Sequence, residues 1–217
     1  MPVDLICAAL AFVLAHRLIS GSGLRDRIVR NSGERMFQMG FAALSVCLTT
    51  WLTWAYLAVA TRASTHPSGV RIVTLLLAAL GCYFIVAGLT TRNPTIAGMG
   101  AATRERNVIH GVIRLTRHPF LIGILFLSGA HLIVMHRLAD WLFFGSLSLV
   151  ALTGMWSIDR KRARAFGTDW QNFRSATSVL PFAAMIAGKQ RLRWFDIGWL
   201  RPALAIVIFA IGLFLHP

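Results

Sequence analysis

The sequence predicts an all-α membrane protein, a polytopic bundle of about six transmembrane helices with both termini on the non-cytoplasmic side. Hydrophobic residues make up 56% of the 217-residue chain and charged residues only 14%, whereas a soluble domain carries about a quarter charged residues. Several apolar segments approach the roughly 20 residues that a helix needs to cross a bilayer. These segments are continuously apolar rather than alternating, which favours helices over the strands of a barrel.

Each apolar segment is expected to form one membrane helix, and the six segments are 3–19, 37–60, 70–90, 119–136, 140–158 and 196–215. The first is expected to be retained, because the N-terminal residues lack the basic region of a cleaved signal and carry only Asp4 as a charge. A shorter apolar stretch, 176–188, contains Pro181 and is expected to lie in the interface or to re-enter the bundle. No repeat or linker divides the chain, so we expect one domain over residues 1–217.

The basic residues are segregated between the two sides of the predicted bundle. Of the 22 Lys and Arg residues, 19 lie after the first, third and fifth apolar segments, and the other side carries only Arg62, Arg71 and Arg137. The positive-inside rule therefore places those three loops in the cytoplasm and both termini outside. The net charge of +14 is explained by this topology, so we expect the lipid bilayer and not nucleic acid as the partner.

Two histidines lie well inside apolar segments, His16 in the first and His131 in the fourth. A charged side chain at mid-helix costs roughly 2.5–3.5 kcal/mol on insertion scales, so these positions need a reason. Each could be a neutral imidazole bound to another helix, or the two could be axial ligands that clamp a haem. The helical rise puts them about 10 and 18 Å from the cytoplasmic boundary, so both alternatives stay open. The small residues Gly129 and Ala130 beside His131 would let a helix or a flat ligand approach the backbone.

A second group of candidate residues lies on the cytoplasmic side. Arg117 and His118 precede the fourth segment, whose first residue is Pro119, and the basic stretch that begins at Asp159 follows the fifth segment. The two stretches could form one site. Arg117 and His118 could be a membrane-entry cap with a snorkelling arginine, or an anion or cofactor site at a helix N-terminus. Under the haem alternative, arginines at helix ends could pair with the propionates, namely Arg17, Arg114 and Arg117.

The three cysteines, Cys7, Cys47 and Cys82, lie inside apolar segments and show no metal-binding spacing. We expect them to be small buried hydrophobic residues.

Several motifs resemble those of the NnrU-like family, which includes a plant zeta-carotene isomerase branch. They run in order along nearly the whole chain and read LAFVLAH, LRDRIVRNSGERMFQMGFAALS, RNP, TRHPFLIGILFLSGAHL and FGTDWQNFRSATSVLPFAAMIAGKQ. The resemblance implies a protein that binds haem b, with His16 and His131 as the iron ligands. The isomerase branch carries a cysteine three residues before the second histidine, which exchanges as a ligand with the redox state of iron. Here that position is Ser128, which the resemblance places among the cofactor-binding residues. Serine is a poor iron ligand, so whether ligand exchange is retained stays open.

The same resemblance implies an activity or a role. The isomerase branch implies redox-dependent cis–trans isomerisation of a carotenoid or another polyene. The bacterial branch is associated by name with nitrite and nitric oxide reduction, and a haem with a displaceable ligand could bind NO. We accordingly expect a multi-pass protein of a bacterial inner membrane.

Two alternatives to an isomerase follow from the sequence. The stretches TRHPFLIG and FGTDWQNF also resemble membrane methyltransferases of the isoprenylcysteine type, in which Arg117 and His118 would help to hold S-adenosylmethionine. Phe120 and Leu121 stand where that family has its tyrosine-bearing segment, and Asp159 stands where it has a glutamate pair. The other alternative is a non-enzymatic accessory protein that carries haem, since the few acidic residues offer no evident general acid or base. No pattern in the sequence indicates an oligomeric state.

Overall fold

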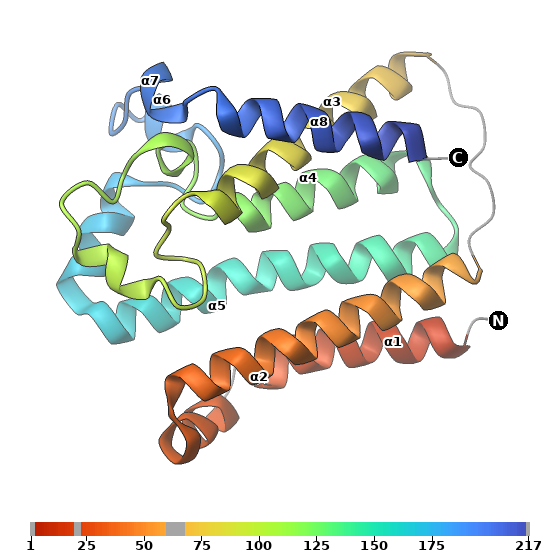
Figure 1. Cartoon of the computed structure of the whole chain (residues 1–217), viewed down its shortest axis with the longest axis horizontal. Helices are drawn as coiled ribbons and strands as arrows, with labels where there is room; N and C mark the ends of the chain where they lie inside the picture. Colours follow the sequence, from red (N-terminus) through yellow and green to blue (C-terminus); the bar gives the residue numbers. More distant parts are fainter. Residues whose placement is uncertain (1–2, 20–22, 60–67, 216–217) are drawn as a thin grey trace. The chain divides into compact units, whose positions relative to one another are not determined.

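The computed structural model describes residues 3–19, 23–59 and 68–215 (Figure 1). The chain is 81% helical, and the described residues include no strand, so the predicted all-α class is confirmed. The long helices are α2 (Gly23–Leu57), α3 (Ser68–Thr90) and α5 (Leu138–Ala176). The other elements are α1 (Val3–Leu14), the π-helical turn η1 (Ala15–Ile19), the 3-10 turns η2 (Gly100–Arg104) and η3 (Gly111–Arg114), and the helices α4 (Pro119–Val134), α6 (Ala183–Ile186), α7 (Trp194–Ile197) and α8 (Leu200–Leu215).

Every predicted membrane segment is helical over most of its length, but two helices extend far beyond their apolar parts. Helix α2 begins at Gly23 and α5 continues to Ala176, and each changes direction at a glycine with positive φ, Gly33 (φ 82°) and Gly167 (φ 50°). By length and composition, three helices could cross a membrane, Gly23–Leu57, Gly69–Thr90 and Leu138–Ala176, and α4 and α8 are shorter apolar helices. The apolar helices are consistent with an integral membrane protein. The orientation of the termini stays a prediction, and Arg62 lies outside the described residues.

The chain forms two compact units, each with its own core. The first unit comprises Met1–Thr74 and Ser128–Gly154, and the second comprises Leu75–Leu127 and Met155–Pro217. In the first unit, the core consists of side chains from α1, α2 and α5, namely Leu5, Ala8, Ala9, Phe12, Leu52, Ala55, Tyr56 and Phe144. In the second unit, it includes Phe84 of α3, Ile122 of α4, and Trp170 and Phe173 of α5. Burial of these aromatic and aliphatic side chains stabilises the packing of the helices within each unit.

In the second unit, glycines allow α3 and α4 to pack with their backbones in contact. A Cβ atom on Gly88 would lie 2.5 Å from the backbone nitrogen of Phe120, and one on Gly123 would lie 2.6 Å from that of Ile85. Only residues without a side chain fit at these two positions, as in other membrane helix pairs joined by small residues.

The short apolar stretch 176–188 is held by the loop that precedes α4. The amide of Arg117 donates to the carbonyl of Ser178, and the amide of Phe182 donates to the carbonyl of Leu115, both at 2.9 Å. Thr177 and Ala184 are buried. The stretch therefore belongs to the second unit as a turn that contains α6.

The prediction of buried cysteines was wrong for two of the three. Cys7 and Cys47 are exposed on the surface of their helices, and Cys82 is half-buried. In a membrane bundle an apolar position faces either the core or the lipid, so an apolar sequence does not by itself indicate burial within the protein.

Candidate functional site

His16 lies in the π-helical turn η1, directly after α1. Its ring contacts Phe12, with ring centroids 4.5 Å apart, and Phe41 of α2, with centroids 5.3 Å apart. Single π-helical turns are rare and occur frequently at functional sites. The turn presents His16 between two phenylalanine rings at the end of the first helix.

The hydrogen bonds of His16 define which ring nitrogen carries the proton. Nδ1 lies 2.8 Å from the carbonyl oxygen of Phe12, and because a carbonyl only accepts, Nδ1 is the protonated nitrogen. Nε2 lies 3.4 Å from Oγ of Ser45, but that hydroxyl donates to the carbonyl of Phe41 at 2.8 Å. In a neutral His16, the lone pair of Nε2 therefore accepts no strong hydrogen bond from Ser45. A backbone carbonyl that fixes Nδ1–H in this way is the usual arrangement around a metal-binding imidazole.

His131 lies in α4 and stacks on Phe144 of α5, with ring centroids 4.3 Å apart and planes inclined by 15°. Phe144 and Phe12 belong to the same buried cluster of the first unit. Both predicted iron ligands thus lie in one unit, each against a phenylalanine of one core. The described residues contain no group of three or more His, Cys, Asp or Glu side chains that could hold a metal ion, so a site here would rest on the two imidazoles.

Ser128 and Gly129 precede His131 in α4 and differ in their surroundings. Ser128 is buried, and its hydroxyl lies 2.7 Å from that of Ser148 in α5. Gly129 has open space, since a Cβ added there would meet no atom within 4 Å. The close helix approach that the sequence suggested at Gly129 occurs instead at Gly88 and Gly123. Gly129 borders open space, and because it lies two helical positions from His131, this space is on nearly the opposite face of α4 from the imidazole.

The arginines predicted to pair with propionates are not equally available. Arg114 binds Asp196 and Gln190 at 3.0 and 2.8 Å. Arg17 follows His16 directly, is exposed, and has no carboxylate partner among the described residues. Within the described ranges, Arg17 is therefore the one of the three predicted arginines that is exposed, without a carboxylate partner and next to a candidate ligand.

The cytoplasmic residues Arg117, His118 and Asp159 come together in the second unit, as the two stretches of sequence suggested. Asp159 of α5 accepts hydrogen bonds from Arg117 Nη2 at 2.5 Å and Nε at 3.0 Å, and from His118 Nε2 at 2.7 Å. Arg117 and His118 are almost fully buried. The anion bound by Arg117 and His118 is therefore the side-chain carboxylate of Asp159.

The electrostatics of His118 favour the neutral imidazole. Burial lowers the pKa of His118, and the nearby charge of Arg117 acts in the same direction, while the hydrogen bond and charge of Asp159 oppose them. With Nε2–H donated to Asp159, Nδ1 is a buried acceptor without a hydrogen-bond partner. The triad is thus a packed ion pair with one unsatisfied atom, and its arrangement joins α5 to the start of α4.

Sequence reasoning missed a second buried charge cluster, which lies in the first unit. Asp140 is fully buried and accepts hydrogen bonds from Tyr56 Oη and from Arg137 Nη2, both at 2.9 Å. The ring of Tyr56 packs edge-on against Phe144, with centroids 5.6 Å apart. This cluster therefore holds the phenylalanine on which His131 stacks. The only signal in the sequence was an acid at the start of an apolar segment.

The NnrU protein family matches residues 4–217 of the chain. Two curated relatives are both named 15-cis-zeta-carotene isomerase, chloroplastic. The one from Arabidopsis thaliana is 35% identical over 112 residues, which cover 49% of this chain and 30% of the relative. The one from Zea mays is 26% identical over 225 residues, which cover 99% of this chain and 60% of the relative. The chain thus spans less than two thirds of the length of these relatives, and no solved structure matches it.

The family resemblance deduced from the motifs is confirmed, since the match extends over nearly all residues. The chain belongs to the NnrU family.

Proposed function

We propose that this chain binds haem b within the membrane and catalyses redox-dependent cis–trans isomerisation of a carotenoid-like polyene. The relatives' names supply the substrate class. The observation that carries the haem part is the state of His16, whose Nδ1–H is fixed by the carbonyl of Phe12 at 2.8 Å while the lone pair of Nε2 stays available.

The donor set fits a haem. Two imidazoles, His16 and His131, lie in one unit on an apolar core, and neutral imidazole is a common axial ligand of haem iron in an apolar pocket. Arg17 is exposed next to His16 and would bind a propionate as a charge-assisted partner.

A bound haem would supply one-electron chemistry that lowers the bond order of a conjugated double bond and so permits rotation about it. The residues of the chain contribute by orienting the two histidines and by forming an apolar environment. Phe12 and Phe41 orient His16, Phe144 orients His131, and the apolar core of the first unit, to which Phe12 and Phe144 belong, excludes water. Isomerisation of a hydrocarbon moves no proton, which agrees with a unit whose buried acid, Asp140, is already bound by Tyr56 and Arg137.

The methyltransferase alternative is not proposed. It would require Arg117 and His118 to bind S-adenosylmethionine, but the side chains of both are engaged by Asp159 and nearly fully buried. A role in nitric oxide metabolism would use the same haem, and no residue that the structure describes favours it over isomerisation. Placement in a bacterial inner membrane is also a proposal, since the relatives are named as chloroplastic.

The haem assignment is tested by pyridine haemochrome content of the detergent-purified protein and of the variants His16→Ala and His131→Ala. His110→Ala is a matched control, because Nδ1 of His110 also bonds a backbone carbonyl, that of Asn107 at 2.9 Å, but lies in a loop. We expect near-stoichiometric haem in the wild type and in His110→Ala, and a loss in the other two. Equal haem content in all four proteins would refute the assignment.

A separate measurement tests the isomerase part. The protein, oxidised or chemically reduced, is incubated with a cis-configured carotene in liposomes, and the isomers are separated by chromatography. We expect conversion only in one redox state, and none in His16→Ala. If haem-loaded protein converts no polyene in either redox state, the isomerase proposal is refuted and a non-enzymatic haem-carrying role is favoured.

A further inference from the structure

The residues that precede α8 form the most exposed apolar stretch of the second unit. Phe195 is 100% exposed, Trp199 79% and Trp194 74%. Large aromatic side chains exposed together in this way indicate a surface that contacts another apolar phase. We refer to residues 189–199 as the interfacial segment.

The interfacial segment is nonetheless firmly attached to its unit. Asp196 binds Nε of Arg114 at 3.0 Å, and Gln190 binds Nη1 of Arg114 at 2.8 Å. Gly111 has φ +51°, and a Cβ there would lie only 2.9 Å from the carbonyl oxygen of Asp196. The aromatic side chains are therefore exposed on an ordered, docked backbone.

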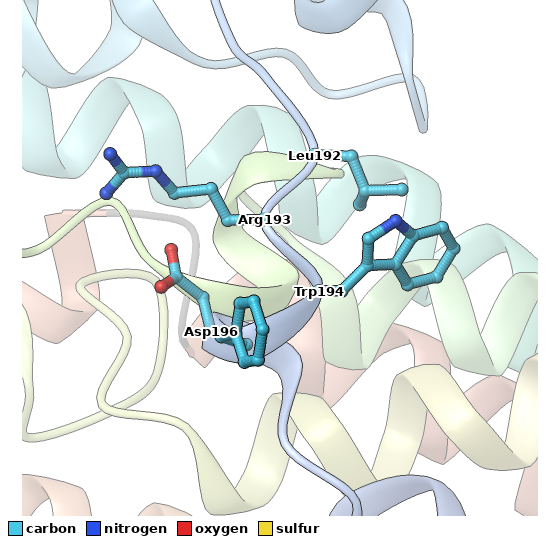
Figure 2. Close-up of a pocket in the computed structure, with 5 residues that line it drawn as sticks. Leu192, Arg193, Trp194 and Asp196 are labelled. Carbon is cyan, nitrogen blue, oxygen red and sulfur yellow. The ribbon is translucent and has the colours of Figure 1, made fainter.

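Three basic residues accompany the aromatic ones, namely Lys189, Arg191 and Arg193. All three are exposed, and none pairs with a carboxylate in the part of the chain that the structure describes. Figure 2 shows the side chains of Leu192 and Trp194 on one side of the backbone and those of Arg193 and Asp196 on the other. Residues 192–196 line an open hollow of about 430 Å³. Apolar and cationic side chains thus alternate along the interfacial segment, so one partner could contact both kinds.

We propose that the interfacial segment binds the headgroups of anionic phospholipids. In this arrangement Lys189, Arg191 and Arg193 bind the phosphate oxygens, while Trp194, Phe195 and Trp199 enter the border between headgroups and acyl chains. Two observations favour lipid over a protein partner. The segment continues directly into α8, an apolar helix whose Ile206, Phe214 and Leu215 are exposed. It also combines a basic cluster with indole rings, the pair of features that marks a membrane interface.

The headgroup part is tested by the thermal stability of the purified full chain in a neutral detergent during titration with phosphatidylglycerol or phosphatidylcholine. A ligand that binds only the folded state raises the melting temperature by mass action. The test variant is K189Q/R191Q/R193Q. The matched control is R27Q/R30Q/R35Q, which removes the same charge from exposed positions of α2.

We expect phosphatidylglycerol, and not phosphatidylcholine, to stabilise the wild type and the control. The interfacial triple variant should bind it on the order of 100-fold more weakly, since each basic residue near an anionic surface contributes roughly a fivefold effect. Equal weakening in both triple variants would show diffuse attraction and overturn the proposal. Free glycerol 3-phosphate should give no shift; a shift equal to that with phosphatidylglycerol would mean a site for a free phosphate ester and would also overturn it.

The aromatic part is tested by tryptophan emission in liposomes, as the difference between the wild type and W194F/W199F. Both positions are exposed, so the variant should fold. We expect this difference signal to be quenched by lipids with brominated acyl chains and shielded from aqueous iodide. Quenching by iodide alone would place the indoles in water, and protection from both quenchers would mean that protein covers them; either result would refute the lipid assignment.

Discussion

The ring of Phe144 lies parallel to that of His131, with centroids 4.3 Å apart and planes inclined by 15°. Phe144 is itself packed edge-on against Tyr56, whose hydroxyl donates to the buried carboxylate of Asp140 at 2.9 Å. A candidate iron ligand is therefore held, through one aromatic ring, by a hydrogen-bonded charge cluster. This connection gives residues far from His131 in the sequence an effect on its orientation.

Phe144→Leu should loosen His131 and lower stability. The substitution removes a stacked, buried ring, and we expect a loss of about 1–2 kcal/mol, below the 3–5 kcal/mol typical of a buried Phe→Ala change. If His131 binds haem, the electron paramagnetic resonance spectrum of the oxidised protein should change as well. Phe143→Leu is the comparison, since it removes a second ring of the same cluster, one that stacks on Tyr56 with centroids 4.5 Å apart and meets Phe144 edge-on at 4.8 Å. Identical spectra for the two variants would contradict a positioning role for Phe144.

Asp159→Asn should be strongly destabilising, because it leaves the buried Arg117 guanidinium without its carboxylate. Removing one partner of a buried pair costs about 3–5 kcal/mol. The comparison is Asp169→Asn, where the carboxylate pairs with Arg104 at 3.1 Å on the surface, and exposed pairs contribute about 0–1 kcal/mol. Denaturant or thermal unfolding in detergent measures both. Similar small losses for both variants would contradict a desolvated ion pair between Asp159 and Arg117.

The helices could be predicted from the sequence where hydropathy alone determines them. All six apolar segments are helical, since a long apolar run has few other stable forms in a bilayer. The extensions of α2 and α5 could not be predicted, because residues 23–36 and 159–176 are polar and carry no hydropathy signal. The π-helical turn at Ala15–Ile19 has no signature in residue types either.

The candidate site was only half predictable, for a related physical reason. His16 and His131 stand out because the cost of an ionisable group in an apolar segment is a local property of the sequence. Their surroundings are long-range: Phe144 beside His131, and Asp159 beside Arg117, join residues that are 13 and 42 positions apart. Such pairs depend on how the helices pack against one another, and a single sequence contains no periodic pattern that reveals this packing.

Stability should fall on acidification in a way that depends on His118, which precedes α4. Burial lowers the pKa of His118 below its ordinary value of 6.5, with Arg117 adding to the effect and Asp159 opposing it. The unfolded chain then binds more protons than the folded one, so the free energy of unfolding decreases as the pH falls below about 6.5 towards the folded-state pKa. His118→Gln keeps a donor towards Asp159 but does not titrate. We expect its melting temperature to change less between pH 7.5 and 5.5 than that of the wild type; an equal or larger change would assign the pH dependence to other groups.

Two glycines of α4 should respond in opposite ways to the same substitution. A Cβ on Gly123 would lie 2.6 Å from the backbone nitrogen of Ile85 and 2.8 Å from the carbonyl oxygen of Gly81, so Gly123→Ala must separate α3 from α4. Backbone atoms cannot move aside as a flexible side chain can, and overpacking of this kind costs about 1–3 kcal/mol. A Cβ on Gly129 meets no atom within 4 Å, so Gly129→Ala gains helix propensity, about 0.5–1 kcal/mol, without a clash.

The melting temperatures of both variants in one detergent provide the comparison. We expect Gly123→Ala to unfold at a lower temperature than the wild type and Gly129→Ala at an equal or higher one. A third variant, Gly129→Leu, separates packing from ligand access, because it fills the open space at Gly129 without touching the α3–α4 contact. A stable Gly129→Leu protein with lower haem content would mean that the cofactor enters through the space at Gly129. An unchanged haem content would show that the cofactor does not pass this part of α4.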